Sequence, residues 1–151
     1  MHRFKYSVTT KAWRPLAWEI YTNWKLWNRF ANVYGDLHWR GGKPWDIGSS
    51  LQIEVRMPVN TIVDHEITSI EPHKKIGWTD RARGIILRQM VEFVDLPDGK
   101  TQILTWGEFS RPTSLVAGRT VAALVTSFTE TWYENYRIAC DELADTVAAS
   151  T

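Results

Sequence analysis

The stretch VAALVTSFTETWYENYRIACDEL, at residues 121–143, decides the fold. Its apolar residues recur every three or four positions, which is the spacing of one face of an α-helix. These residues are Val121, Leu124, Val125, Phe128, Trp132, Tyr136, Ala139 and Leu143. The pattern predicts a helix from near Ser114 to Val147, about 50 Å long at a rise of about 1.5 Å per residue. A helix with so wide an apolar face needs a broad partner.

The residues before this helix alternate in a way that predicts strands. An opening strand is expected at 4–8, followed by two short helices: Pro15 suits the first turn of one that reaches Trp24, and the second spans Leu26 to Phe30, with a break near Asn23. About six mostly antiparallel strands follow, at 37–40, 51–57, 59–67, 75–78, 85–94 and 101–109, with a loop at 78–84 and the strongest turn at 96–99. The order predicts an α+β fold in which a curved antiparallel sheet wraps around the long C-terminal helix. Such wrapping commonly leaves space between sheet and helix, so a binding cavity is the first functional hypothesis.

Composition excludes several classes of function. With 151 residues, 44% hydrophobic and 23% charged, the sequence is typical of a globular protein, and we expect one domain over 1–151. Eighteen basic residues nearly balance seventeen acidic ones and are scattered, so nucleic acid is not an expected partner. The N-terminal MHRFKYSVTT lacks the apolar core of a signal peptide, and no run approaches the roughly 20 apolar residues of a membrane span. We therefore expect a cytoplasmic protein without integral membrane association, either a monomer or a homodimer.

Several short motifs resemble those of a known superfamily. The order of elements is similar to the helix-grip fold of the SRPBCC superfamily, which includes START-like lipid carriers, birch-pollen-allergen-like proteins and polyketide cyclases. The matching stretches are Val8-Thr9-Thr10 leading to Trp18 and Trp24–Trp27, Ile70-Glu71-Pro72 with Ile76-Gly77-Trp78, and Val91-Glu92-Phe93 followed by Asp98-Gly99-Lys100-Thr101. The resemblance covers essentially the whole chain and implies a small hydrophobic ligand, such as a lipid, isoprenoid, polyketide or aromatic metabolite. These motifs are mainly turns and core positions, so they identify a fold better than a reaction.

Motifs for cofactor or nucleophile chemistry are missing from the sequence. It contains no Gly-x-Ser-x-Gly, no GxGxxG and no Walker-type phosphate loop. The four histidines, His2, His38, His65 and His73, fall on separate predicted segments without metal-ligand spacing. Cys140 lies in the long helix near the edge of its apolar face, where a packed side chain is expected more than a nucleophile. We therefore expect neither a bound metal nor a cofactor.

His65 is the weak candidate for catalysis. It shares a predicted strand face with Val63 and Ile67, pointing at the long helix, where a neutral imidazole could bond a ligand or act as a general base. The alternative is a histidine satisfied by a neighbouring strand or a buried water. Gln89 is expected on the same side of the sheet, able to orient a ligand carbonyl or hydroxyl. The predicted ligand-binding residues are Trp27, Val55, His65, Trp78, Gln89, Val91, Trp106, Val125, Phe128, Trp132 and Tyr136, although the face of Trp106 is ambiguous because Ile103 and Thr105 compete for the inward direction.

Three functional hypotheses remain open. The first is a binding module that holds a small, mostly apolar molecule between the sheet and the last helix. The second is an enzyme of the polyketide cyclase, aromatase or dehydratase type, in which His65 moves a proton and Tyr136 or Gln89 polarises a carbonyl. The third is a partner-binding or stress-response protein whose cavity is filled by its own nine tryptophans.

Overall fold

Seven strands form one antiparallel sheet in the order β1-β7-β6-β5-β4-β3-β2. The computed structural model describes residues 2–57, 60–110 and 115–150. The strands are β1 (His2–Thr10), β2 (Tyr34–Arg40), β3 (Ser50–Val55), β4 (Thr61–Glu71), β5 (Lys75–Ala82), β6 (Ile85–Asp95) and β7 (Thr101–Ser110). Strands β2 to β7 each pair with their neighbour in the chain, because short turns favour antiparallel hairpins. The first strand closes the far edge by pairing with β7 from His2↔Phe109 to Thr10↔Thr101.

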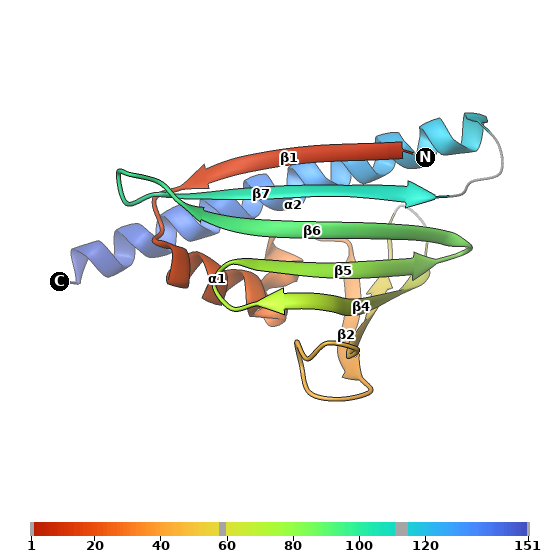
Figure 1. The fold of residues 1–151 in the computed structure, drawn as a ribbon, viewed down its shortest axis with the longest axis horizontal. Helices are drawn as coiled ribbons and strands as arrows, with labels where there is room; N and C mark the ends of the chain where they lie inside the picture. The colour runs from red at the N-terminus through yellow and green to blue at the C-terminus, as the bar shows by residue number, and fades with distance from the viewer. Residues whose placement is uncertain (1, 58–59, 111–114, 151) are drawn as a thin grey trace.

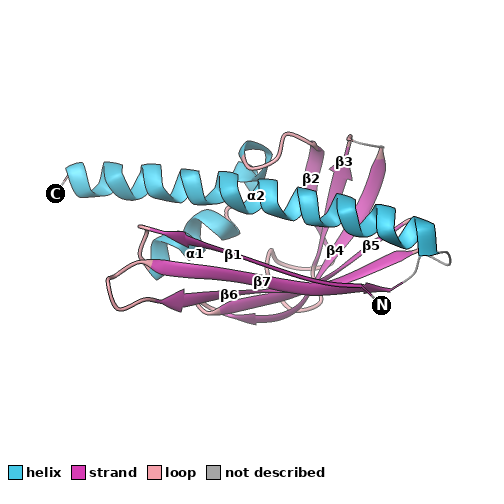
Figure 2. Cartoon of the chain, turned by 90° about the horizontal axis from the view of Figure 1, so that it is seen from above, coloured by secondary structure: helices cyan, strands magenta, loops and turns pink. Residues whose placement is uncertain are grey.

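The helices lie on one face of this sheet. They are α1 (Arg14–Thr22), the 3-10 helix η1 (Trp24–Arg29) and α2 (Leu115–Ala149). Figure 1 shows the sheet with α2 behind it, and Figure 2, turned by 90°, shows α2 running along the length of the sheet. None of the helices in the described part of the chain combines the length and the hydropathy of a membrane span. The expected starts at Val59 and near Ser114 lie outside the described residues.

The core is unusually aromatic and sits where α1, η1 and α2 meet the inner face of the sheet. Tyr21 of α1 packs against Phe93 of the sheet and against Trp132 of α2, with ring centroids 5.5 and 5.3 Å apart. Phe30 packs on Trp132 and Tyr136 at 5.0 and 5.6 Å. Most of these contacts are edge-to-face, which aromatic quadrupoles favour. The aromatic cluster therefore fixes the middle of α2 against the two short helices.

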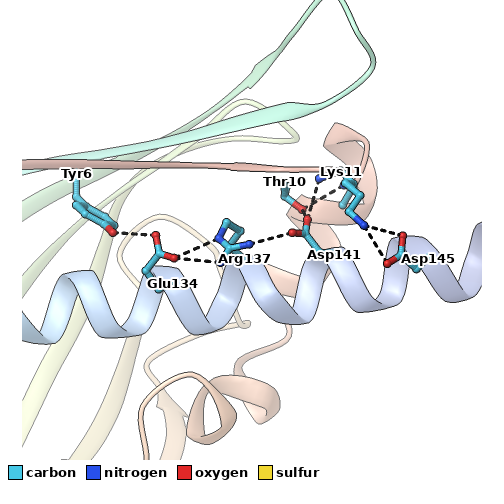
Figure 3. Close-up of polar contacts among 8 residues, drawn as sticks. Tyr6, Thr10, Lys11, Glu134, Arg137, Asp141 and Asp145 are labelled. Carbon is cyan, nitrogen blue, oxygen red and sulfur yellow. Dashed lines mark hydrogen bonds and ion pairs between the residues drawn. The ribbon is translucent and has the colours of Figure 1, made fainter.

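Polar side chains fasten the second half of α2 to β1 (Figure 3). The Tyr6 hydroxyl donates to Glu134 over 2.8 Å, and the Thr10 hydroxyl donates to Asp141 over 2.6 Å. Arg137 lies between the two carboxylates and bonds both, at 3.2 and 3.1 Å. A row of charge-assisted hydrogen bonds thus joins the helix to the edge strand.

Beyond shifts in where β2, β3 and β4 begin or end, two differences from the sequence predictions concern β5 and α2. Strand β5 continues to Ala82, whereas the sequence predicted a short strand to residue 78 and then a loop. The apolar face of α2 is only partly buried, since Leu124, Phe128 and Leu143 are 50%, 39% and 41% exposed. The exposure of Leu124 and Phe128 has a physical reason, because both lie beside the space described next.

Candidate functional site

A cavity of about 270 Å³ lies between the inner face of the sheet and α2. The strands contribute residues at alternate positions, as the pleat requires. From the other side, α2 contributes residues spaced three and four apart. The lining residues are Tyr21, Trp27, Tyr34, Ile53, Val55, Met57, Val63, His65, Trp78, Asp80, Leu87, Gln89, Leu124, Val125, Phe128, Thr129, Trp132 and Tyr133. Aromatic and aliphatic side chains dominate this wall, and a few polar groups are set among them.

The most distinctive polar group is a histidine–aspartate pair on neighbouring strands. The register of β4 and β5 places His65 opposite Asp80, and both side chains point to the inner face. His65 Nδ1 lies 2.5 Å from Asp80 Oδ1, and the Trp78 indole N–H donates to Asp80 Oδ2 over 3.2 Å. Trp27 and Trp78 flank the imidazole with ring centroids 5.8 and 5.2 Å away. The pair is therefore held in place from both sides.

The other nitrogen of His65, Nε2, lacks a partner in the described part of the chain. The side chain is 6% exposed, and its Nε2 has no hydrogen-bond partner among the described residues. Because a carboxylate only accepts hydrogen bonds, the proton in the contact with Asp80 belongs on Nδ1. In the neutral ring, Nε2 is then a bare acceptor on the wall of the cavity. Buried polar groups are normally paired, so this unpaired atom marks a place for a ligand atom or a water.

The tyrosines of the cavity remain protonated at neutral pH. The hydroxyls of Tyr21 and Tyr133 lie 3.1 Å apart and share one hydrogen bond. Burial raises the pKa of Tyr133 to about 12 and raises the pKa of Tyr21 and Tyr34 above the ordinary value. These phenols can give and accept hydrogen bonds, but they cannot serve as bases.

Gln89 is partly satisfied within the protein. Its amide N–H donates to Thr105 Oγ1 over 2.8 Å, and that hydroxyl donates to the carbonyl of Met90 over 2.8 Å. These hydrogen bonds join the amide group of Gln89 to Thr105 on β7. Gln89 is therefore a weaker candidate for ligand recognition than His65.

The structure brings together most of the ligand-binding residues predicted from the sequence. Those on the cavity wall are Trp27, Val55, His65, Trp78, Gln89, Val125, Phe128 and Trp132. The other three lie elsewhere. Val91 is fully buried in the core, and Tyr136 is also fully buried, with its hydroxyl donating to the carbonyl of Ala17 over 2.5 Å. Trp106 lies on the outer face of the sheet and is 37% exposed, because Thr105 takes the inward position on β7.

Sequence reasoning missed the second half of the polar pair. The sequence predicted a loop at 78–84, which contains Asp80 together with Arg81 and Arg83, yet Asp80 occupies an inward position of β5 two residues after Trp78. The alternation Trp78, Asp80, Ala82 was the signal available in the sequence. It was missed because a charged side chain is uncommon at an inward position of a sheet. The two arginines point elsewhere: Arg81 pairs with Glu66 at 2.8 Å, and Arg83 donates to the carbonyl of Asn60 over 2.8 Å.

No group that could hold a metal ion, meaning three or more His, Cys, Asp or Glu side chains together, occurs in the described ranges. Asp64 and Glu66 flank His65 in sequence but lie on the opposite face of β4, as strand alternation dictates. The chemistry of the site therefore centres on one imidazole, one carboxylate and aromatic surface.

Comparison with solved structures places this architecture. A START superfamily protein from Mycobacterium smegmatis matches with a TM-score of 0.75 at 13% identity, covering 95% of this chain and 99% of that one. A conserved protein from Geobacillus kaustophilus matches with a TM-score of 0.78 at 10% identity, over 93% and 96% of the two chains. The Zhui aromatase/cyclase from Streptomyces sp. R1128 matches with a TM-score of 0.72 at 12% identity, over 95% and 93%. The chain has the helix-grip fold.

The sequence prediction of a helix-grip fold is thereby confirmed. No family model matches the sequence, and no curated protein matches it. At 10 to 13% identity, the likeness of these helix-grip structures extends to the fold alone. Function must therefore be argued from the cavity of this chain.

Proposed function

We propose that the protein binds a small hydrophobic molecule in the cavity between the sheet and α2. The observation that carries this proposal is the cavity of about 270 Å³ with its largely aromatic and aliphatic wall. Transfer of apolar surface from water into such a space is favourable by about 25 cal/mol per Å². The START superfamily and aromatase/cyclase names of the structural neighbours agree with this class of function. The open volume weighs against the hypothesis of a cavity filled by its own tryptophans.

A pair of tryptophan substitutions on α2 tests the proposal. Val125→Trp places an indole in the cavity, whereas Ser127→Trp adds the same side chain at an exposed position two residues away. Isothermal titration calorimetry with naphthalene as probe should show binding to the wild type and to Ser127→Trp. Binding should weaken about tenfold or more in Val125→Trp, because the space is occupied. If no apolar ring compound binds and native mass spectrometry finds none co-purified, the proposal fails.

The second candidate function is enzymatic proton transfer of the cyclase, aromatase or dehydratase type. It is favoured by the His65–Asp80 pair, since an aspartate-oriented imidazole with a free nitrogen is the arrangement of a general base. His65 Nε2 would take a proton from carbon next to a carbonyl, leave an enolate, and return a proton from solvent.

Deuterium exchange tests this second function without knowledge of the natural substrate. The compact ketone 2-tetralone in D₂O should exchange its α-hydrogens faster with the wild-type protein than with His65→Ala. His38→Ala, which changes an exposed histidine on β2, is the matched control and should exchange like the wild type. Equal exchange by the wild type and His65→Ala would remove the catalytic role.

A further inference from the structure

We infer that the cavity selects an uncharged ligand of one or two rings that carries an O–H or N–H group, and that this group donates to His65 Nε2. The inference rests on the proposed function and adds the chemistry of the ligand to it. Three independent properties of the wall support it: an unpaired acceptor, the absence of lysine and arginine among its described residues, and the size and shape of the space.

The first property is the unpaired acceptor, His65 Nε2. His65 Nε2 is buried and has no partner in the part of the chain that the structure describes. In the neutral imidazole the 2.5 Å contact with Asp80 places the proton on Nδ1, and Nε2 then offers a lone pair. A ligand that only accepts hydrogen bonds, such as an ether or ester, leaves this atom unsatisfied. A site built to bond a polar hydrogen rejects analogues that lack one.

The charge of the wall comes second. Asp80 is its one carboxylate, and no lysine or arginine occurs among the described lining residues. An anionic ligand would lose its hydration without gaining a counter-ion, and it would be repelled by Asp80. A cationic ligand would also lose its hydration in a mostly apolar space, and the carboxylate that could offset this loss, Asp80, is already bonded to His65 and Trp78. An uncharged ligand avoids the desolvation cost of both charged classes.

Size and shape come third. The cavity of about 270 Å³ is close to the lower end of the usual range of about 300–1,000 Å³ for small-ligand pockets. This suits a compact ring system rather than a two-chain lipid. Rings of Trp27, Trp78 and Phe128 face the space from different elements. Aromatic walls favour flat ligands that can stack or meet them edge-on.

Naphthalene and three of its derivatives separate these three properties, and 2-naphthylmethylammonium serves as a cationic control. Naphthalene measures apolar binding alone, 2-methoxynaphthalene adds an acceptor, 2-naphthol adds a donor, and 2-naphthoate adds a negative charge. By isothermal titration calorimetry near neutral pH, 2-naphthol should bind the wild type about tenfold more tightly than 2-methoxynaphthalene, the value of one hydrogen bond to an unpaired group. 2-Naphthoate should bind more weakly than naphthalene. Tighter binding of 2-naphthoate or of 2-naphthylmethylammonium than of 2-naphthol would overturn the inference.

Two variants tie the preference to the pair. His65→Phe keeps a ring of similar size without the acceptor. The affinities of 2-naphthol and 2-methoxynaphthalene should then differ by less than about threefold, while naphthalene still binds. Asp80→Asn reverses the polarity: the amide donates to His65 Nδ1 and accepts from Trp78, so the imidazole proton moves to Nε2. The preference should then shift toward 2-methoxynaphthalene. Nitrogen-15 NMR of the imidazole reports the tautomer, and circular dichroism checks that each variant folds.

The outcomes distinguish failure of the proposed function from failure of the inferred ligand chemistry. If none of the four compounds binds the wild type, the proposed function fails. If naphthalene binds but 2-naphthol gains nothing over 2-methoxynaphthalene, only the ligand chemistry fails. An unchanged preference in both folded variants would likewise overturn the role of His65.

Discussion

Burial lowers the reactivity of the Cys140 thiol. The side chain is fully buried in the core, and burial raises the pKa of its thiol to about 12. Because the thiolate is the reactive form, almost none is present at neutral pH. The structure therefore gives this cysteine a packing role, as its place on the helix suggested.

Cys140 should accordingly be inert in the folded protein. At pH 8, we expect labelling with a thiol reagent such as DTNB to be roughly a hundredfold or more slower than in the urea-unfolded chain. The absorbance of the released thiolate measures both rates on the same sample. Stoichiometric labelling of the native protein as fast as that of the unfolded chain would contradict this account.

Residue-scale prediction of the site succeeded where a face was well determined. His65 could be placed inward because Val63 and Ile67 share its side of the strand. Asp80 could not, because a charge after Trp78 is more common at a strand end than inside a sheet. Its partial burial is favoured by His65 and Trp78, which both donate to it. That pairing joins residues on different strands, and a single sequence does not show the register between them.

The attachment of α2 to β1 belongs to the scale of elements, and Asp141 is its centre (Figure 3). One Asp141 oxygen accepts from the Thr10 hydroxyl at 2.6 Å and from the Lys11 backbone N–H at 2.8 Å, while the other accepts from Arg137 at 3.1 Å. The carboxylate is only 19% exposed, so water replaces these bonds poorly. This contact should contribute far more than an ordinary surface ion pair.

We therefore expect Asp141→Ala to lower the free energy of unfolding by about 2 kcal/mol, since it leaves the buried Thr10 hydroxyl and a backbone N–H short of an acceptor. Urea denaturation followed by circular dichroism measures this. The matched control is Asp145→Ala, one turn further along α2, which removes a 3.0 Å ion pair to Lys11 between side chains that are 55% and 63% exposed. That variant should change stability by about 0.5 kcal/mol or less. Equal losses in the two variants would refute the difference assigned to burial.

At the scale of elements, the sequence predicted the order of strands and helices better than their faces and ends. Hairpins and helix spacing are local signals, so β6, β7 and α2 were predicted close to their observed bounds. The face of Trp106 depended on which neighbour points inward, and buried threonines took positions expected for larger apolar residues. Thr101 and Thr105 both lie inside, each satisfied by a backbone carbonyl. Such satisfaction depends on neighbouring strands and is not encoded locally.

The whole molecule should respond to alkaline pH through its buried tyrosines. Burial raises the pKa of Tyr133 to about 12 and the pKa of Tyr21, Tyr34 and Tyr136 above the ordinary value of about 10. A raised pKa in the folded state means that the unfolded chain loses these protons first as pH increases. The stability they contribute is complete below about pH 10 and is lost as pH rises toward 12 and beyond.

We expect the free energy of unfolding to fall above about pH 10, by about 1.4 kcal/mol per pH unit for each such tyrosine. Absorbance at 295 nm reports tyrosinate, and far-ultraviolet circular dichroism reports folding. The tyrosinate signal of these residues should appear together with unfolding, not before it. A full tyrosinate signal near pH 10 with the helical spectrum intact would show that the core is open to solvent.

The two sides of the cavity also have separate consequences for how the protein could change. The groups proposed to bind a ligand's polar hydrogen, His65, Asp80 and Trp78, lie on adjacent strands of a hydrogen-bonded sheet. The side chains on the helix side of the cavity, among them Val125 and Phe128, lie on α2. The proposed hydrogen-bonding groups and the helix side of the cavity wall therefore belong to different elements of the fold. Substitutions at exposed positions of α2 could change the range of ligand sizes, in evolution or in protein engineering. They would leave His65, Asp80 and Trp78 in place.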